Sequence, residues 1–211
     1  MTSELMAYCR RWSDEVAGID QEEDRMAYFQ KHLPELLLDR TAVLPVLENM
    51  AKGRPWPDLR NPGLFAHEVL LYLDSSRRFS LRAYFHPPHT HSDIHDHTSW
   101  GISGTPFGRL SVIGYACGQP GADGRVALTR RRHVILPAGQ VDVTLPWNQG
   151  IHQTGSPDDV MNMMLSIYGR PGRRLYIQIF HPAAGEVHRR YPPKILRRML
   201  ARQALAACTN S

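Results

Sequence analysis

The sequence predicts a mainly β fold, a single jelly-roll barrel with a helical N-terminal cap and a C-terminal helix. Residues 63–186 contain many short segments rich in β-branched and aromatic residues, separated by turns of glycine, proline, aspartate and serine. Closely spaced short strands of this kind are typical of β-sandwiches and closed barrels. Residues 1–62 and 187–211 instead carry apolar residues at helical spacing. A chain of 211 residues suits one domain, so we expect residues 1–211 to form a single unit.

The N-terminal segment predicts three helices. Ser3 can cap the first, whose apolar residues share one face: Leu5, Cys9, Trp12 and Val16. Asp20, followed three residues later by Glu23, resembles a capping box at the start of the second helix. A third, short helix is expected to begin near Pro45 and to stop at Gly53, because proline suits a first turn and glycine a C-terminal end.

The barrel region predicts a series of strands bounded by turn residues. The expected strands are residues 65–73, 78–85, 99–103, 109–117, 126–131, 133–136, 141–145, 161–168 and 175–180. The clearest turn signals are residues 74–76, 118–124, 137–139 and 169–172. From residue 194 to residue 207 the chain returns to the pattern of a basic amphipathic helix.

The composition predicts a soluble protein of a reducing compartment. Hydrophobic residues make up 42% and charged residues 21% of the chain, as in ordinary globular proteins. No apolar run approaches the ~18 residues of a membrane span. The N-terminus alternates charged and apolar residues, unlike a signal peptide. Cys9, Cys117 and Cys208 are widely spaced and odd in number, which argues against a disulfide framework. We therefore expect a cytoplasmic protein without a membrane partner.

The formal net charge of +5 raises the question of nucleic-acid binding, since arginines cluster at Arg130–Arg132 and Arg197–Arg198. No interleaved aromatic motif or recognition-helix pattern accompanies these clusters. Solvated surface charge explains them, so we expect a small-molecule partner and no nucleic acid. The oligomeric state does not follow from the sequence.

Three histidines form the candidate metal site. His95 and His97 are separated by one residue in a β-patterned stretch, so strand alternation turns both side chains to the same face. His152, in Gly150-Ile151-His152, can join them from a distant strand. None of the five residues that follow His97 is a glutamate that could add a carboxylate ligand, so the candidate ligand set consists of three neutral imidazoles. This set predicts one divalent metal ion inside the barrel.

His89 and His91 are the nearest competing ligands. They lie in a proline-rich loop, residues 86–93, where strand alternation does not apply. His91 could pair with His95 or His97, but a polar loop at the barrel mouth also explains both loop histidines. We favour that second interpretation.

These residues resemble a known family. The runs that carry the resemblance are His95-Asp96-His97-Thr98-Ser99-Trp100-Gly101, Gly150-Ile151-His152-Gln153 and Leu165-Ser166-Ile167-Tyr168-Gly169. They look like the thiol dioxygenases of the cupin superfamily, the cysteine and 3-mercaptopropionate dioxygenases. The resemblance covers about residues 65 to 186. It implies a cupin double-stranded β-helix holding one Fe(2+) ion, with O2 and a thiolate at adjacent open positions and a sulfinate as product.

The resemblance also implies catalytic residues and shows where this chain departs from the family. Ser166 and Tyr168 stand in the family's outer-sphere relay, Ser-x-His-x-Tyr, of which only the tyrosine is unchanged, and they are the candidate catalytic residues. The family's carboxylate-binding arginine has no counterpart in residues 65–70, where His67 is the closest replacement. Ile102 stands where some members have a cysteine crosslinked to the tyrosine.

One strand offers a replacement for the missing arginine. Alternation along residues 78–86 puts Phe79, Leu81, Ala83 and Phe85 on one face, as core residues, and Ser80, Arg82, Tyr84 and His86 on the other. Tyr84 and His86 match pocket-lining positions of the family. Arg82 could therefore enter the barrel and bind an anionic group, the alternative being an exposed strand arginine. The candidate substrate-binding residues are Arg82, Tyr84, His86 and His67.

Two classes of function follow from the sequence. The first is an Fe(2+)-dependent dioxygenase that oxidises a small thiol, or a related small anionic metabolite, with O2. The second is a non-oxygenase cupin that binds Zn, Ni or Mn, either an isomerase or lyase or a small-molecule-binding protein. A cupin oxygenase with a non-thiol substrate is a further alternative. Neutral imidazoles bind several transition metals, so the sequence does not choose the metal.

Overall fold

The structure is a computed structural model that describes residues 4–61 and 63–209. It begins with the helices α1 (Glu4–Glu15), α2 (Glu22–Leu38) and α3 (Arg40–Ala51), and the 3-10 turn η1 (Val16–Gly18) follows α1. The strands are β1 (Glu68–Leu73), β2 (Phe79–His86), β3 (Ile94–His95), β4 (Gly101–Gly104), β5 (Arg109–Cys117), β6 (Leu128–Pro137), β7 (Val141–Thr144), β8 (His152–Gly155), β9 (Asn162–Gly169), β10 (Ile177–His181) and β11 (Glu186–Arg190). The 3-10 turn η2 (Trp147–Gly150) precedes β8, and helix α4 spans Pro193–Thr209.

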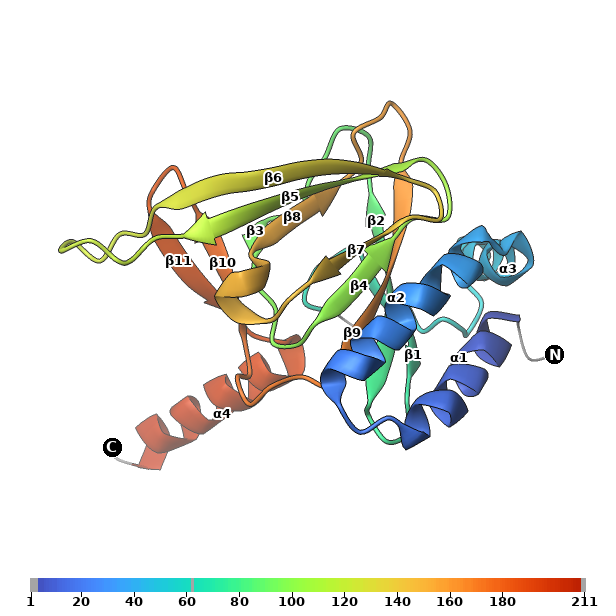
Figure 1. Ribbon diagram of the computed structural model, residues 1–211. Helices are drawn as coiled ribbons and strands as arrows, with labels where there is room; N and C mark the ends of the chain where they lie inside the picture. Colours follow the sequence, from blue (N-terminus) through green and yellow to red (C-terminus); the bar gives the residue numbers. More distant parts are fainter. Residues whose placement is uncertain (1–3, 62, 210–211) are drawn as a thin grey trace.

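The strand pairing is that of a jelly roll. Strand β5 pairs with β6, β4 with β7, β3 with β8 and β2 with β9, all antiparallel, so that four consecutive strands pair in reverse order with the next four. The result is two sheets, of order β1-β2-β9-β4-β7 and β11-β10-β3-β8-β5-β6 (Figure 1). Eight strands paired in this nested way form a jelly roll. The predicted fold class, a mainly β jelly-roll barrel with N-terminal helices and a C-terminal helix, is confirmed.

The N-terminal helices cover the outer face of the five-stranded sheet (Figure 1). The largest apolar core lies between them, where Phe29 of α2 meets Phe79 of β2 with ring centroids 4.7 Å apart and Leu81 is fully buried. The opposite face of β2 carries Tyr84 and His86 into the barrel. The alternation predicted for this strand is confirmed, and it explains why one face holds helices and the other a site.

The beginning of the second helix differs from the prediction. Helix α2 begins at Glu22, with Gln21 at the N-cap position and no side-chain cap hydrogen bond, so the predicted capping box of Asp20 and Glu23 is wrong. Three acidic residues in its first turn instead interact favourably with the helix dipole. The predicted cap of the first helix, Ser3, lies outside the described residues.

The third helix begins earlier than predicted, at Arg40 instead of near Pro45. Asp39 is its N-cap, because Oδ1 accepts hydrogen bonds from the backbone N–H groups of Thr41 and Ala42 at 2.9 and 3.3 Å. Pro45 then lies inside the helix, where it removes one backbone hydrogen bond. The side-chain cap therefore decides the start of this helix.

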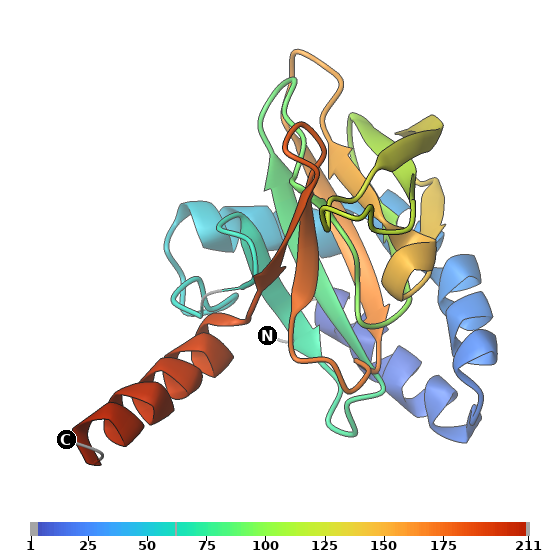
Figure 2. The same cartoon turned by 90° about the vertical axis from the view of Figure 1, so that its left-hand side faces the viewer.

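The strands differ from the prediction where they are short or polar. Strands β3 and β8 have two and four residues, too few to show alternation, and they exist because neighbouring strands pair with them. Strand β6 is continuous where the sequence predicts two strands. Strand β11, which the sequence does not predict, pairs with β10 in the first part of the tail 187–211. Helix α4 begins at Pro193, one residue before the predicted start. Helix α4 then projects away from the barrel (Figures 1 and 2).

No helix within residues 4–61 and 63–209 combines the length and the apolar character needed to span a lipid bilayer.

Candidate metal centre

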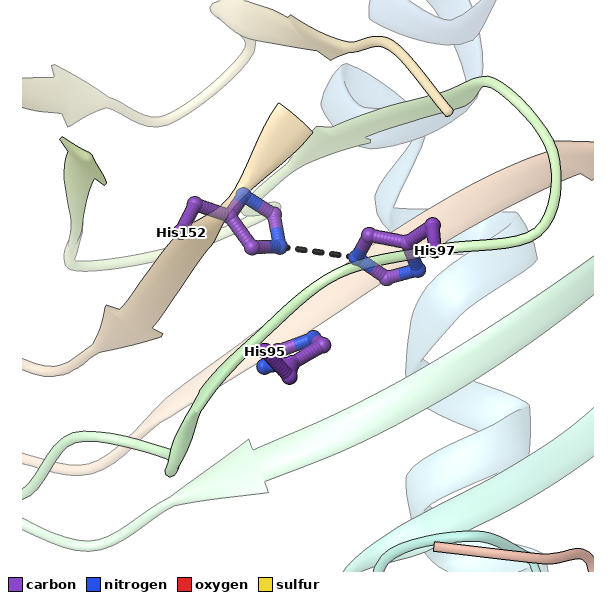
Figure 3. Close-up of side chains that lie close together, drawn as sticks. All are labelled: His95, His97 and His152. Carbon is purple, nitrogen blue, oxygen red and sulfur yellow. Dashed lines mark hydrogen bonds between the residues drawn. The ribbon is translucent and has the colours of Figure 1, made fainter. Parts of the chain in front are cut away.

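The three predicted ligands meet inside the barrel. Strand β3 pairs with β8 so that His95 lies directly opposite His152, and His97 follows on the same side of the chain as His95. Their ring centroids are 4.7 to 4.9 Å apart, and one nitrogen from each ring lies within 4.8 Å of the others. Figure 3 shows the rings turned toward one another. All three residues are at most 8% exposed.

The hydrogen-bond partners of His95 and His152 occupy their Nδ1 atoms, which leaves the Nε2 atoms of these two rings for a metal. His95 donates from Nδ1 to the backbone carbonyl of Asp93 at 2.8 Å, and His152 Nδ1 lies 3.1 Å from Oγ1 of Thr144. The Nε2 atoms of His97 and His152 are 2.9 Å apart (Figure 3). Two nitrogens about 2.1 Å from one ion and about 90° apart are separated by about 3.0 Å, against about 3.4 Å in a tetrahedron. The separation of these two nitrogens is therefore short enough for both to bind one ion, and the ligand atom of His95 lies within 4.8 Å of them.

Burial keeps the three rings in the form that binds metal. It lowers the pKa of His95 to about 4 and the pKa values of His97 and His152 well below the ordinary histidine value. Near neutral pH each ring is therefore uncharged, with a lone pair available for coordination.

No carboxylate belongs to this cluster among the described residues. Three acidic side chains lie near the histidines in sequence or line the neighbouring cavity, and each is bound by an arginine: Asp93 by Arg190, Asp96 by Arg174 and Glu68 by Arg82. The site is therefore a set of three neutral imidazoles, which suits a divalent transition metal better than Mg or Ca.

Three cavities are lined by a histidine of the cluster; the one of about 470 Å3 borders His152 and none of the other candidate site residues, and the other two are lined by candidate substrate-binding residues. The larger of these two, about 120 Å3, is lined by His97, Arg82, Tyr84 and Tyr168. The smaller, about 10 Å3, lies on the side of His95 and His152. A space of the smaller size holds one water-sized ligand, whereas the larger has room for part of a small metabolite. A small metabolite can therefore approach the metal position only from the side of the larger of these two cavities.

Arg82 lines the larger cavity, and an unpredicted carboxylate accompanies it. The guanidinium donates to Oε1 of Glu68, whose side chain is buried. Oε2 of Glu68 accepts the backbone N–H groups of Leu64 and Phe65 at 2.7 and 3.2 Å. Glu68 lies opposite Tyr84 in the β1–β2 pairing, so the two side chains share the inner face. The sequence analysis missed Glu68 because the strand register that brings it to Arg82 is not visible in the sequence. The carboxylate of Glu68 neutralises the charge of Arg82.

The candidate catalytic residues lie on the inner face of β9. The ring of Tyr168 stacks on that of His97 with centroids 5.2 Å apart. Burial raises the pKa of Tyr168, and hydrogen bonding from Tyr84 and Ser166 partly offsets that rise. Ser166 is fully buried, and its Oγ lies 2.7 Å from that of Ser103. Tyr168 therefore contacts a histidine of the cluster directly, whereas Ser166 contacts Tyr168 and Ser103.

His67 and His86 line the smaller cavity. Their ring centroids are 5.2 Å apart, and Nε2 of His86 has a long contact of 3.4 Å to Oγ1 of Thr154. Nε2 of His67 is buried without a hydrogen-bond partner among the residues that the structure describes. Burial lowers the pKa of His67 and brings that of His86 to about 3. Both are neutral rings beside the metal position.

The two loop histidines do not join the cluster. His89 pairs with Asp159 at 2.7 Å, and Nε2 of His91 lies 3.0 Å from Oγ of Ser111. Both residues are exposed, in agreement with the interpretation as a polar loop. Fold and site together define a jelly-roll protein with a candidate three-histidine metal centre.

Comparison with known proteins adds likenesses of fold. No protein-family model matches the sequence, and neither does any curated protein. Among solved structures, a cupin 2 conserved barrel domain protein from Salinispora arenicola is 19% identical over 48% of this chain and 73% of its own, with a TM-score of 0.36. A sugar phosphate isomerase from a cupin superfamily of Silicibacter pomeroyi is 14% identical over 62% of this chain and 82% of its own, with a TM-score of 0.37.

A third likeness is to the oxalate decarboxylase of Bacillus subtilis, a protein with Mn(II) centres. It is 15% identical over 51% of this chain and 26% of its own, with a TM-score of 0.37. The assignment of the jelly roll rests on the strand pairing of this chain, and that of the metal centre on its own histidines.

Proposed function

We propose that this protein is a mononuclear non-haem Fe(2+) dioxygenase of the cupin superfamily that oxidises a small thiol to a sulfinate. The observation that carries the proposal is the cluster of three buried, neutral imidazoles, with no carboxylate among them in the described residues, next to a cavity that holds Arg82 and Tyr168. We further propose that it acts on a free small molecule, without a nucleic-acid or membrane partner.

The proposed reaction balances with O2 as the only co-reactant. A thiolate RS− and O2 give RSO2−, in which sulfur loses four electrons, O2 gains four, and two S–O bonds replace the O–O bond. A ferrous ion held by the three histidines would supply open positions at which a thiol loses its proton and meets O2. Because the three ligands are neutral, the ion would keep its full charge, which favours an anionic sulfur ligand.

The residues of the larger cavity would bind and orient the substrate. Arg82 would hold an anionic group with the donors that Glu68 leaves free, and Tyr84 would form the adjacent wall. Tyr168, stacked on His97, would place its hydroxyl beside the reacting atoms, and Ser166 would support that hydroxyl. His67 and His86 would exclude bulky groups from the opposite side.

A second candidate function follows from the Glu68–Arg82 ion pair. A guanidinium already neutralised by a buried carboxylate is a weaker anion receptor than a free one. This observation favours a non-oxygenase metal-binding cupin, an isomerase, lyase or small-molecule-binding protein, or an oxygenase with a non-thiol substrate. Such a protein would use the same three histidines, and the non-oxygenase would bind Zn, Ni or Mn.

Anaerobic reconstitution with Fe(2+), followed by O2 uptake with a panel of small thiols and amino acids, tests the proposal. We expect one thiol to consume O2 in a 1:1 ratio and to give a sulfinate by mass spectrometry. His152→Ala should abolish iron binding and uptake, whereas the control His91→Ala, a loop histidine outside the cluster, should leave both unchanged. Stoichiometric iron binding without uptake for any thiol would refute the thiol dioxygenase and favour the second candidate.

A further inference from the structure

Trp147 has an unusual backbone conformation at the start of the turn η2. Its φ is +60°, in the left-handed region that side-chain-bearing residues rarely adopt. The turn runs from Trp147 to Gly150 and leads directly to the ligand His152 on β8. A tryptophan held in this region requires contacts that offset the strain. Two of those contacts join Trp147 to the segment that carries His95 and His97.

The first contact joins Trp147 to the other ligand-bearing segment. Its backbone N–H donates to the carbonyl of His97 at 2.9 Å. The ring fits because residue 172 is glycine, where a Cβ would lie 2.8 Å from Cζ2 of Trp147. Trp147 thus binds the main chain of one ligand and begins the turn that delivers another.

The second contact runs through a partly buried arginine, Arg174. The guanidinium of Arg174 lies 4.5 Å from the Trp147 ring centroid and 5.0 Å from that of Tyr176. Nη2 of Arg174 donates to Oδ1 of Asp96 at 2.5 Å, and Asp96 is fully buried. The same oxygen accepts the backbone N–H of Gln178 at 2.7 Å. Asp96 lies between the ligands His95 and His97, so this chain of contacts ends at the HxH segment.

We propose that Trp147 is a positioning residue for the metal centre, acting through Arg174 and Asp96 on one segment and through η2 on the other. It touches no ligand ring, but it fixes how far apart the segments of His97 and His152 lie. Groups that orient metal ligands from behind commonly change metal affinity when they are removed. The inference rests on the proposed metal centre and is independent of any reaction with O2.

Zinc affinity, measured by chelator competition on the full chain, tests the inference. Trp147→Gly keeps the turn, because glycine adopts a positive φ without strain, and removes only the ring. We expect it to weaken Zn2+ binding about 10- to 100-fold, with Trp147→Phe in between. The control Trp56→Phe alters a tryptophan that packs against the helix-side core and should leave the affinity unchanged. The absorption spectrum of bound Co2+ should shift in Trp147→Gly only.

Arg174→Met provides a second, independent measurement, since it leaves the backbone of Trp147 intact. It should weaken Zn2+ binding by a similar factor, and the double variant should bind no more weakly than the weaker single variant, because both residues act in one chain of contacts. Wild-type Zn2+ affinity in both single variants, or fully additive losses in the double variant, would overturn the inference. If Trp147→Gly does not fold, the Zn2+ affinity of Arg174→Met tests the inference alone. If Arg174→Met does not fold either, the double variant Asp96→Asn/Arg174→Met replaces it, because removing both charges leaves no unpaired buried charge. Loss of dioxygenase activity with normal Zn2+ binding would instead bear only on the proposed function.

Discussion

Acidification of the metal-free protein should destabilise it through His86, and the size of the effect follows from burial. The pKa of His86 is about 3 in the folded protein, against 6.5 for an unperturbed histidine, because the ring is desolvated inside the barrel. The unfolded chain therefore binds a proton at a higher pH than the folded protein does. The contribution of His86 to stability is present above pH 6.5 and is lost as the pH falls from there toward 3.

The linkage relation gives the magnitude. Between pH 7 and pH 5, protonation of the unfolded state alone costs about 2 kcal/mol of unfolding free energy for one such histidine. His95, with a pKa of about 4, should add a similar loss in the metal-free protein. Replacing His86 with leucine should remove its own share, so the variant should lose about 2 kcal/mol less than the wild type over this range.

Urea unfolding of the metal-free wild type and of His86→Leu at pH 7 and pH 5 measures this difference. The matched control is His181→Asn, which replaces an exposed histidine and should lose as much stability on acidification as the wild type. The reasoning is refuted if His86→Leu and the wild type lose equal free energy, because His86 would then be protonated or solvated in the folded state.

Four further outcomes are expected. His152→Ala should abolish stoichiometric metal binding in elemental analysis, because two imidazoles hold a divalent ion poorly. Arg82→Met should lower kcat/KM for an anionic substrate about 10- to 100-fold, mainly through KM, and unchanged kinetics would remove Arg82 from the site. Cys9, whose pKa burial raises to about 12, should resist iodoacetamide in the native protein and react after denaturation, as peptide mapping would show. A chain lacking residues 1–60 should aggregate in light scattering, because it exposes the apolar face of the five-stranded sheet, and a monodisperse product would contradict this.

The metal cluster was predictable because its information is local. The i, i+2 spacing predicts that His95 and His97 share one side of the chain, and the structure brings both rings together with that of His152, although β3 ends at His95. The inner face of β2 was predictable for the same reason, since Phe79 and Leu81 pack under the helices while Tyr84 faces the cavity. Side chains alternate between the two faces of a strand whichever strand it pairs with.

Two features were not predicted, one that depends on strand register and one that depends on which of two local signals starts a helix. Glu68 reaches Arg82 only because β1 pairs with β2 in one register, with an irregularity between Leu70 and Tyr72. The beginning of α3 was missed because the cap of Asp39 outweighs the signal of Pro45. In both cases a local pattern allowed more than one outcome, and a specific contact selected between them.

The sequence by itself determined the fold class, the three histidines and the inner face of β2, because strand alternation and turn chemistry act over a few neighbouring residues. Only the tertiary structure decided that Glu68 neutralises Arg82 and that Trp147 reaches the carbonyl of His97. Those pairs join residues far apart in the chain, and their contact depends on strand register and turn geometry, which no local pattern encodes.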